Sequence, residues 1–481
     1  MEKHLSTVVL NNSFCQLVDF PEDVIKAVKA KLTYADEDVM MQKQMLYSQM
    51  RRAKGKMFYA IKAKFAALGP DFICLLDGDN SFPTGLLHLV KELLPAYELV
   101  DKRSKPGYEL ILRWNNKPDE LRYFQKEAVD AFMSKGRGVF QMAVGSGKTR
   151  CAVEVIKQLA VNTLFIVPST ALLTQAHDIF VSAFGSKNVE AITTANIKKG
   201  KKLKPIRVVT IQTLASLNKQ GLIKGVLTGV DLLILDECHH SGADSFKKLL
   251  GAFQGIYYRL GLSGTYLRND SKTLDLWGVC GEVIYDYNAA KATSEGFLTP
   301  VEFNIIPVPG QYKRNYQTEY RENYGSIHLM NAIHNILINK INEDKQVLIL
   351  VDRKEQCGHL IYEYLKEKSI KCTYVNGDDN KETIANAIED FNDKKTRILL
   401  ASTILGEGCD IRSTDVLIMA RGGKSEIAMT QAVGRAVRLY KDKEIAQVYD
   451  FNFQTSKYMT KHLELRIETY IKQFAGKVNY E

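Results

Sequence analysis

The chain has 481 residues, of which 45% are hydrophobic and 25% are charged, a composition typical of a folded protein of about three domains. Its formal net charge of +10 fits a polyanionic partner, but it fits an ordinary basic protein equally well. The sequence shows no signal-peptide pattern, no apolar stretch of the roughly 18 residues that span a bilayer, and no C-x-x-C pair among its eight cysteines, so we expect a cytoplasmic protein with free thiols and no membrane partner.

Residues 1–112 differ in pattern from the rest of the chain. Their short mixed segments predict a small α+β domain. Basic residues crowd one stretch of it, around Phe58 and Tyr59, although the region as a whole is only slightly positive. We therefore expect this domain to bind DNA through a local patch. The patch contains Arg51, Arg52, Lys54 and Lys56.

The remaining sequence alternates short apolar runs with helical patterns. Continuous apolar runs at 164–167, 232–235 and 347–351 predict strands that are buried on both faces of a parallel sheet. Amphipathic helices between such strands predict an α/β fold with helices on both sides of each sheet. Glycines and prolines interrupt the pattern near residue 300, so we expect one lobe at 113–300 and a second at 301–481.

A phosphate-binding loop is predicted where the sequence reads MAVGSGKT, between an apolar strand and an amphipathic helix. Gly145 and Gly147 would let backbone N–H groups curl around phosphates at the start of the helix. Lys148 would neutralise the β- and γ-phosphates of ATP, and the Thr149 hydroxyl would ligate Mg²⁺. The expected nucleotide contacts of this loop are Gly145, Ser146, Gly147, Lys148 and Thr149.

Carboxylates and an amide complete the predicted nucleotide site. Asp236 and Glu237 follow an apolar strand, the place where ligands bind in open α/β sheets. Asp236 is expected to hold Mg²⁺, and Glu237 to orient and activate the attacking water. Gln125 lies upstream of the loop and could read the adenine edge, the alternative being a surface glutamine. His239 and His240 lack a third ligand at suitable spacing, which argues against zinc.

These segments, in this order, resemble the motifs of superfamily 2 helicases with a D-E-C-H box, over about residues 121–438. The resemblance implies two RecA-like lobes in tandem. It implies nucleotide contacts at Gly408 and Asp410. It also implies residues that link the state of the bound ATP to the binding of the nucleic-acid strand, namely Ser263, Thr265 and Gln431. The nucleic-acid contacts that it implies are Pro168, Thr170, Gln175, Gln212, Thr213 and Thr403.

The motif Q-x-x-G-R-x-x-R near the end of the second lobe supplies two arginines. Arg435 and Arg438 are three residues apart and would share one face of a helix. They could reach a γ-phosphate held by the first lobe and stabilise the transition state, as arginine fingers do. The predicted catalytic residues are Lys148, Asp236, Glu237, Arg435 and Arg438.

Within the superfamily the chain looks most similar to phage branch-migration helicases of the UvsW kind, and more distantly to XPB-type motors. That resemblance implies an ATP-dependent DNA helicase or translocase, monomeric and without sequence preference. It would unwind or branch-migrate forks, D-loops and Holliday junctions in recombination, repair or replication, in the bacterial host cytoplasm if a phage encodes it. Three alternatives stay open: a double-stranded DNA translocase of a restriction or repair assembly, an ATP-gated clamp or annealing module, and an RNA substrate.

Overall fold

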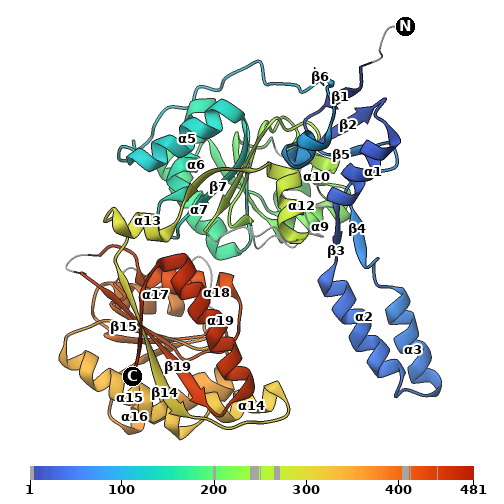
Figure 1. Ribbon diagram of the computed structural model, residues 1–481. Helices are drawn as coiled ribbons and strands as arrows, with labels where there is room; N and C mark the ends of the chain where they lie inside the picture. Colours follow the sequence, from blue (N-terminus) through green and yellow to red (C-terminus); the bar gives the residue numbers. More distant parts are fainter. Residues whose placement is uncertain are drawn as a thin grey trace.

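The computed structural model describes residues 5–198, 202–238, 249, 251–264, 271–402, 411, 413–440 and 443–481. Three sheets organise the described residues, two with seven strands and one with four, and a short two-stranded ribbon accompanies the smallest (Figure 1). Several predicted residues lie outside the described ranges. These are Thr265, Thr403, Gly408, Asp410, His239 and His240.

The first seven-stranded sheet is parallel throughout and has the strand order β13-β7-β12-β11-β8-β10-β9. Its central strands are buried along their whole length, which is why they read as unbroken apolar runs. The strands are β7 (Arg137–Met142), β8 (Thr163–Val167), β9 (Val189–Ala191), β10 (Ile206–Thr210), β11 (Leu232–Leu235), β12 (Tyr258–Ser263) and β13 (Val283–Tyr287). The α-helices are α5 (Tyr123–Lys135), α6 (Lys148–Leu159), α7 (Thr170–Phe184), α8 (Thr194–Lys198), α9 (Ile211–Lys219), α10 (Ile223–Leu227), α12 (Ser271–Cys280) and α13 (Ala289–Ser294).

The second seven-stranded sheet is also parallel throughout, in the order β16-β17-β15-β18-β19-β14-β20. Its strands are β14 (Val301–Pro309), β15 (Val347–Leu350), β16 (Thr373–Val375), β17 (Ile398–Ala401), β18 (Val416–Met419), β19 (Ala446–Gln454) and β20 (Lys477–Tyr480). Its α-helices are α14 (Tyr316–Tyr324), α15 (Ile327–Asn342), α16 (His359–Glu367), α17 (Lys381–Asn392), α18 (Glu426–Ala436) and α19 (Lys457–Phe474). The predicted α/β class with two parallel-sheet lobes in tandem is therefore confirmed.

The edge of the second sheet explains two prolines inside a strand. The Ile305 carbonyl of β14 faces β20, where it accepts a hydrogen bond from the Glu481 N–H. Pro307 and Pro309, two and four residues later, direct their backbone groups to the same side of β14, but β20 pairs only with residues 302–305. The missing N–H groups therefore fall on an edge position, where proline removes no sheet hydrogen bond.

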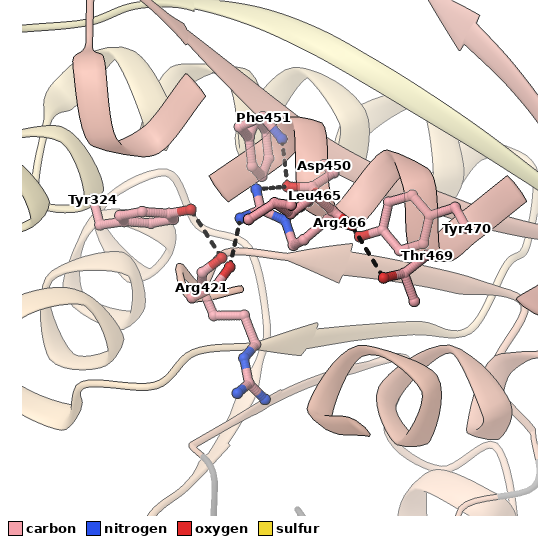
Figure 2. Close-up of polar contacts among 9 residues, drawn as sticks. Tyr324, Arg421, Asp450, Phe451, Leu465, Arg466, Thr469 and Tyr470 are labelled. Atoms are coloured by element: carbon pink, nitrogen blue, oxygen red, sulfur yellow. Dashed lines mark hydrogen bonds and ion pairs between the residues drawn. The ribbon is translucent and has the colours of Figure 1, made fainter. Parts of the chain in front are cut away.

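A buried ion pair fixes the last long helix against the second sheet (Figure 2). Arg466 of α19 donates two hydrogen bonds to Asp450 of β19, at 2.7 and 2.8 Å, and both side chains are only 1% exposed. The Tyr470 hydroxyl adds a third, at 2.8 Å. Arg466 also donates to the Gly423 carbonyl at 3.1 Å, so the network holds the loop that leads into α18.

The N-terminal residues form a separate small unit with a four-stranded sheet of order β5-β2-β1-β6. Antiparallel pairs join β1 to β2 and β2 to β5, and a parallel pair joins β1 to β6. The strands are β1 (Thr7–Leu10), β2 (Phe14–Val18), β3 (Thr33–Ala35), β4 (Phe72–Cys74), β5 (Ser81–Pro83) and β6 (Glu98–Asp101). The α-helices are α1 (Glu22–Lys31), α2 (Glu37–Met50), α3 (Gly55–Ala66) and α4 (Leu87–Val90).

Two helices of this unit form an arm. Strands β3 and β4 pair antiparallel, with Ala35 opposite Phe72, so the segment between them leaves and returns at one place. Helices α2 and α3 pack against each other and extend away from the sheets (Figure 1). We call residues 36–71 the arm.

The N-terminal unit docks on the first lobe through polar and close-packed contacts. Arg259 of β12 is completely buried and donates to the Ser13 hydroxyl of the turn between β1 and β2. Gly85 lies so close to the Trp277 carbonyl of α12 that a Cβ atom there would overlap it. These contacts tie the unit to the first lobe.

None of the described helices is long and apolar enough to cross a membrane.

Candidate active site

The predicted phosphate loop lies between β7 and α6. Gly145 and Gly147 have φ of 87° and 88°, the left-handed region that glycine adopts without strain, and Gly147 caps α6. The Ser146 hydroxyl is buried and has no hydrogen-bond partner among the described residues. A buried polar atom of this kind is costly unless a ligand satisfies it, so the loop fits a bound phosphate.

Three neighbouring strands bring the other acidic and polar groups to the same edge. In the sheet order, β12 lies between β7 and β11, and Ser263 at its end is opposite Gln141 of β7. Asp236 and Glu237 follow directly after β11. The predicted residues of the first lobe therefore converge although they come from segments about 90 residues apart.

Lys148 is nearly buried at the centre of this edge. Its Nζ donates to the Met142 carbonyl at 3.3 Å and lies 4.0 Å from the Glu237 Oε1. A Cβ atom on Gly264 would lie 3.0 Å from the same Nζ. Glycine at position 264 therefore leaves the space that the lysine needs, which explains the small residue after Ser263.

The carboxylates of Asp236 and Glu237 are arranged to favour a cation. Burial raises the pKa of Asp236, the neighbouring Glu237 charge raises it further, and Lys148 opposes both. A divalent ion would relieve this accumulation of negative charge. Carboxylate and hydroxyl oxygens are suitable ligands for Mg²⁺, which also keeps waters and phosphate oxygens as ligands, so Asp236 and Thr149 fit such an ion.

Gln125 faces the phosphate loop. It is buried in α5, and its Nε2 donates to the Ser146 carbonyl at 2.8 Å while its Oε1 accepts from the Arg122 N–H at 3.0 Å. The side chain thus links the start of α5 to the loop. If Gln125 also contacts adenine, as the sequence predicts, the same side-chain amide must serve both the base and the phosphate loop.

Helix α18 of the second lobe packs on this loop. A Cβ atom on Gly434 would lie 2.7 Å from the Val144 Cβ, so only glycine allows this approach. The Arg438 Cγ lies 3.5 Å from the position of a Cβ atom on Gly145. The last predicted motif of the second lobe and the first predicted motif of the first lobe are therefore in contact.

The two arginines do not share a helical face, because α18 ends at Ala436. The Val437 carbonyl accepts a hydrogen bond from the Thr299 N–H at 2.8 Å, and the Ala436 carbonyl accepts one from Lys443. The Arg438 carbonyl accepts from the Thr299 hydroxyl at 3.3 Å. Thr299 and Lys443 hold the chain around Arg438, and no sequence motif identified them.

The predicted nucleic-acid contacts of the first lobe gather beside the nucleotide edge. Pro168 and Thr170 follow β8, and the Gln212 Nε2 at the start of α9 donates to the Pro168 carbonyl at 2.9 Å. Thr170, Gln175 and Gln212 are exposed. The Thr213 hydroxyl instead accepts from Thr210 at 2.9 Å, where it helps to cap α9.

Residues 198–207 are rich in lysine and arginine, and two of the cations that the structure describes there, Lys204 and Arg207, bind within the lobe. Arg207 is buried, and its guanidinium donates to the Thr228 carbonyl at 3.0 Å. Lys204 donates to the Ser186 and Val189 carbonyls at 2.6 and 3.0 Å. Both cations thus complete the packing around β10.

Two family models match the lobes. Residues 119–268 match the res subunit of type III restriction enzymes, and residues 328–440 match the helicase conserved C-terminal domain. Together they span the phosphate loop, the acidic pair and the arginine motif.

Known proteins align over most of the chain. The ATP-dependent DNA helicase uvsW of Enterobacteria phage T4 is 24% identical over 79% of this chain and 80% of its own length. The DNA 3'-5' translocase XPB2 of Sulfurisphaera tokodaii is 24% identical over 68% of this chain and 80% of its own length. The structure of Saccharomyces cerevisiae Dbp5 bound to RNA and ADP BeF3 superposes with a TM-score of 0.54, at 14% identity, over 75% of this chain and 89% of that one. The chain belongs to the superfamily 2 ATP-dependent helicases and has UvsW-like relatives.

Proposed function

We propose that this helicase uses ATP to unwind or branch-migrate branched DNA, such as forks, D-loops and four-way junctions. The observation that carries the proposal is a basic arm attached to the lobe that holds the phosphate loop. The relatives named for DNA helicase and translocase activity support a DNA substrate.

In the first lobe we assign the nucleotide chemistry to the residues that converge on the phosphate loop. The backbone N–H groups around Gly145 and Gly147 and the Lys148 ammonium bind the phosphates. Glu237 orients the attacking water and accepts its proton, and the Lys148 Nζ lies 4.0 Å from its Oε1. Thr149 and Asp236 would hold Mg²⁺, which neutralises charge on the phosphate oxygens when it is bound.

From the second lobe, Arg435 and Arg438 stabilise charge that develops on the transferred phosphoryl group. The contact between Gly434 and Val144 sets their distance from the first lobe. Hydrolysis therefore requires that the lobes approach, and separation of the lobes after hydrolysis converts ATP turnover into movement along DNA. We assign the coupling of the two events to Ser263, the last residue of β12, and to Gln431, which precedes Gly434 by three residues in α18.

DNA runs along the exposed groups at the ends of β8 and β10. Thr170, Gln175 and Gln212 contact phosphates and sugars there, which carry no sequence information. Binding is therefore nonspecific and weakens steeply with salt.

The arm gives the motor a preference for branched substrates. It extends from the unit docked on the first lobe, and Arg51, Arg52, Lys54 and Lys56 at its tip are exposed (Figure 1). Cations held at a distance from the lobes can contact a second duplex or strand of a junction while the lobes move along the first. A linear duplex would not engage both sites.

The proposal is tested with a labelled four-way junction, a fork, a linear DNA duplex and an RNA duplex, each with and without ATP. We expect ATP-dependent resolution of the junction and fork. Lys148→Ala should abolish hydrolysis and unwinding but leave DNA binding, because its ammonium is nearly buried in the nucleotide site. Resolution of the RNA duplex alone would refute the proposal, and ATP-dependent binding without strand separation would favour a clamp.

The arm is tested by a charge-matched comparison. Substituting Arg51, Arg52 and Lys54 together by Gln should weaken junction binding and reduce the slope of log affinity against log salt by about 0.9 for each phosphate that is no longer neutralised. The control substitutes three exposed lysines of the second lobe, Lys366, Lys368 and Lys371. Equal effects of the two sets would show that the arm has no special part.

A further inference from the structure

The arm carries exposed aromatic and thioether side chains that its helix packing does not use. Helices α2 and α3 pack against each other, and Leu46, Phe58 and Ile61 are among their less exposed side chains, Ile61 being buried. Tyr47, Met57 and Tyr59 are instead 60%, 66% and 70% exposed. Several large apolar side chains exposed on one short helical hairpin are unusual unless they bind something.

The charge around these side chains selects the partner. Residues 39–66 contain seven basic residues, Lys43, Arg51, Arg52, Lys54, Lys56, Lys62 and Lys64, and no Asp or Glu. Lys43 pairs with Asp71 at the base of the arm, at 2.7 Å, and the other six lie toward the tip and along α3. A surface of this charge attracts a polyanion and repels most basic partners.

Aromatic and basic residues alternate on the helix faces. Lys56 and Lys62 lie three residues before and after Tyr59, and Arg51 lies four residues after Tyr47, so each ring is next to a cation on its own face. Phe58 packs edge-on against Tyr59, with ring centroids 5.7 Å apart, which steadies the exposed ring. Rings beside cations are the surface that single-stranded nucleic acids bind, with bases on the rings and phosphates on the cations.

We infer that the arm stacks unpaired bases on Tyr59 and Tyr47 where strands diverge, while Arg51, Lys56 and Lys62 hold the adjacent phosphates. The inference rests on the proposed function and deepens it, because it names unpaired bases at the branch point as the ligand of the arm. Paired bases are stacked within a duplex and do not offer their faces. The tyrosines of the arm therefore distinguish the unpaired bases at a branch from the paired bases of a continuous duplex, and its cations bind the phosphates beside them.

The test uses a DNA fork with 2-aminopurine at the first unpaired position, beside a linear duplex, in the absence of ATP. Binding of the intact protein should change the 2-aminopurine emission. Tyr59→Ala should weaken fork binding about tenfold, the range of one base–aromatic stack, and leave duplex binding unchanged. Tyr59→Phe should behave as the intact protein, since the ring and not the hydroxyl is required.

Two controls separate stacking from charge and from removal of any exposed tyrosine. Lys56→Gln should weaken fork binding and reduce its salt slope by about 1, while the bound fork still shows the change in 2-aminopurine emission. Tyr480→Ala removes a tyrosine that is 69% exposed in the second lobe and should change nothing.

Wild-type fork binding and emission in Tyr59→Ala and Tyr47→Ala, with a clear effect of Lys56→Gln, would overturn the stacking and leave the proposed DNA motor intact. Wild-type behaviour of all three variants would overturn any role of the arm in DNA binding. An acidic protein partner would produce that second result.

Discussion

The Tyr34 hydroxyl donates a hydrogen bond of 2.7 Å to the Asp275 carboxylate, and this bond joins the base of the arm to helix α12 of the first lobe. Tyr34 lies on β3, directly before the arm, while α12 begins seven residues after Gly264, which borders Lys148. The same helix receives the N-terminal unit at Trp277. The arm is therefore anchored to the first helix that the structure describes after Gly264.

Tyr34→Phe removes only the hydroxyl from this hydrogen bond. We expect it to lower the free energy of unfolding by about 1–3 kcal/mol, because a part-buried carboxylate is deprived of a charge-assisted donor. Asp275→Asn should cost less, since the amide oxygen still accepts from Tyr34. Denaturant titration measures both, and unchanged stability in Tyr34→Phe would mean that solvent satisfies Asp275 equally well.

Arg438 gives a sharper test of how the lobes cooperate. Arg438→Ala should lower kcat for ATP hydrolysis by about 10³-fold, the lower end for arginine fingers, while nucleotide binding to the first lobe persists. Arg438→Lys should not restore the rate, because an ammonium lacks the forked donors of guanidinium. Arg397→Ala, which removes an exposed arginine paired with Asp344, is the matched control. The measurement is nucleotide affinity and turnover for each variant. A fall in affinity with unchanged turnover would contradict the role of Arg438 in stabilising the transition state.

The two parallel sheets could be predicted because a strand that is buried on both faces has an unbroken run of apolar residues in its sequence. Leu232–Leu235 and Val347–Leu350 are unbroken apolar runs in the sequence and buried strands in the structure. The phosphate loop was equally local, since its two glycines and its lysine lie within four residues of each other. The convergence of Asp236 with Lys148 could be predicted because the carboxyl ends of parallel strands meet at one edge of the sheet.

Long-range contacts could not be predicted in this way. Arg438 falls outside α18, and its carbonyl accepts a hydrogen bond from Thr299, 139 residues earlier, instead of one from a following turn of helix. The neighbours of Arg207 in the sequence indicate a surface cation, yet the Thr228 carbonyl binds it inside the lobe. The arm was visible only as a basic cluster, since pairing of β3 with β4 across 36 residues is what makes it project.

The Asp450–Arg466 pair should be the most sensitive polar contact of the second lobe. Asp450→Asn should lower the free energy of unfolding by about 3–5 kcal/mol, because it leaves a buried guanidinium without its counter-charge. The decrease should exceed that of Tyr470→Phe, which removes one neutral donor at 2.8 Å. If a double variant with Asp450→Leu and Arg466→Met recovers stability, the cost lies in the unpaired charge and not in poorer packing. Thermal or denaturant unfolding of the four proteins makes the comparison.

Glu319 should make the second lobe sensitive to acid. Burial acts to raise the pKa of this carboxyl, but hydrogen bonds from the Lys313 N–H, the Ser456 hydroxyl and the Tyr458 N–H lower it below the ordinary 4.5. The N–H donors lie at 2.9 and 2.7 Å, and the latter belongs to the first turn of α19. Because the folded pKa is the lower one, the stabilisation is complete above pH 4.5 and is lost as the pH falls through the folded value.

Glu319→Gln should therefore lower the free energy of unfolding by about 2 kcal/mol at pH 7 and flatten its decline between about pH 5 and pH 3. The side chain of the Glu319→Gln variant has one oxygen that can accept, whereas both carboxylate oxygens of Glu319 accept hydrogen bonds. Its NH₂ group would therefore face the donors of one of these oxygens, so the amide cannot replace the carboxylate. Glu322→Gln is the control on the same helix, where the carboxylate is 38% exposed and pairs with Arg321 at 3.1 Å. Parallel pH profiles of stability for the intact protein and Glu319→Gln would show that another group causes the acid sensitivity.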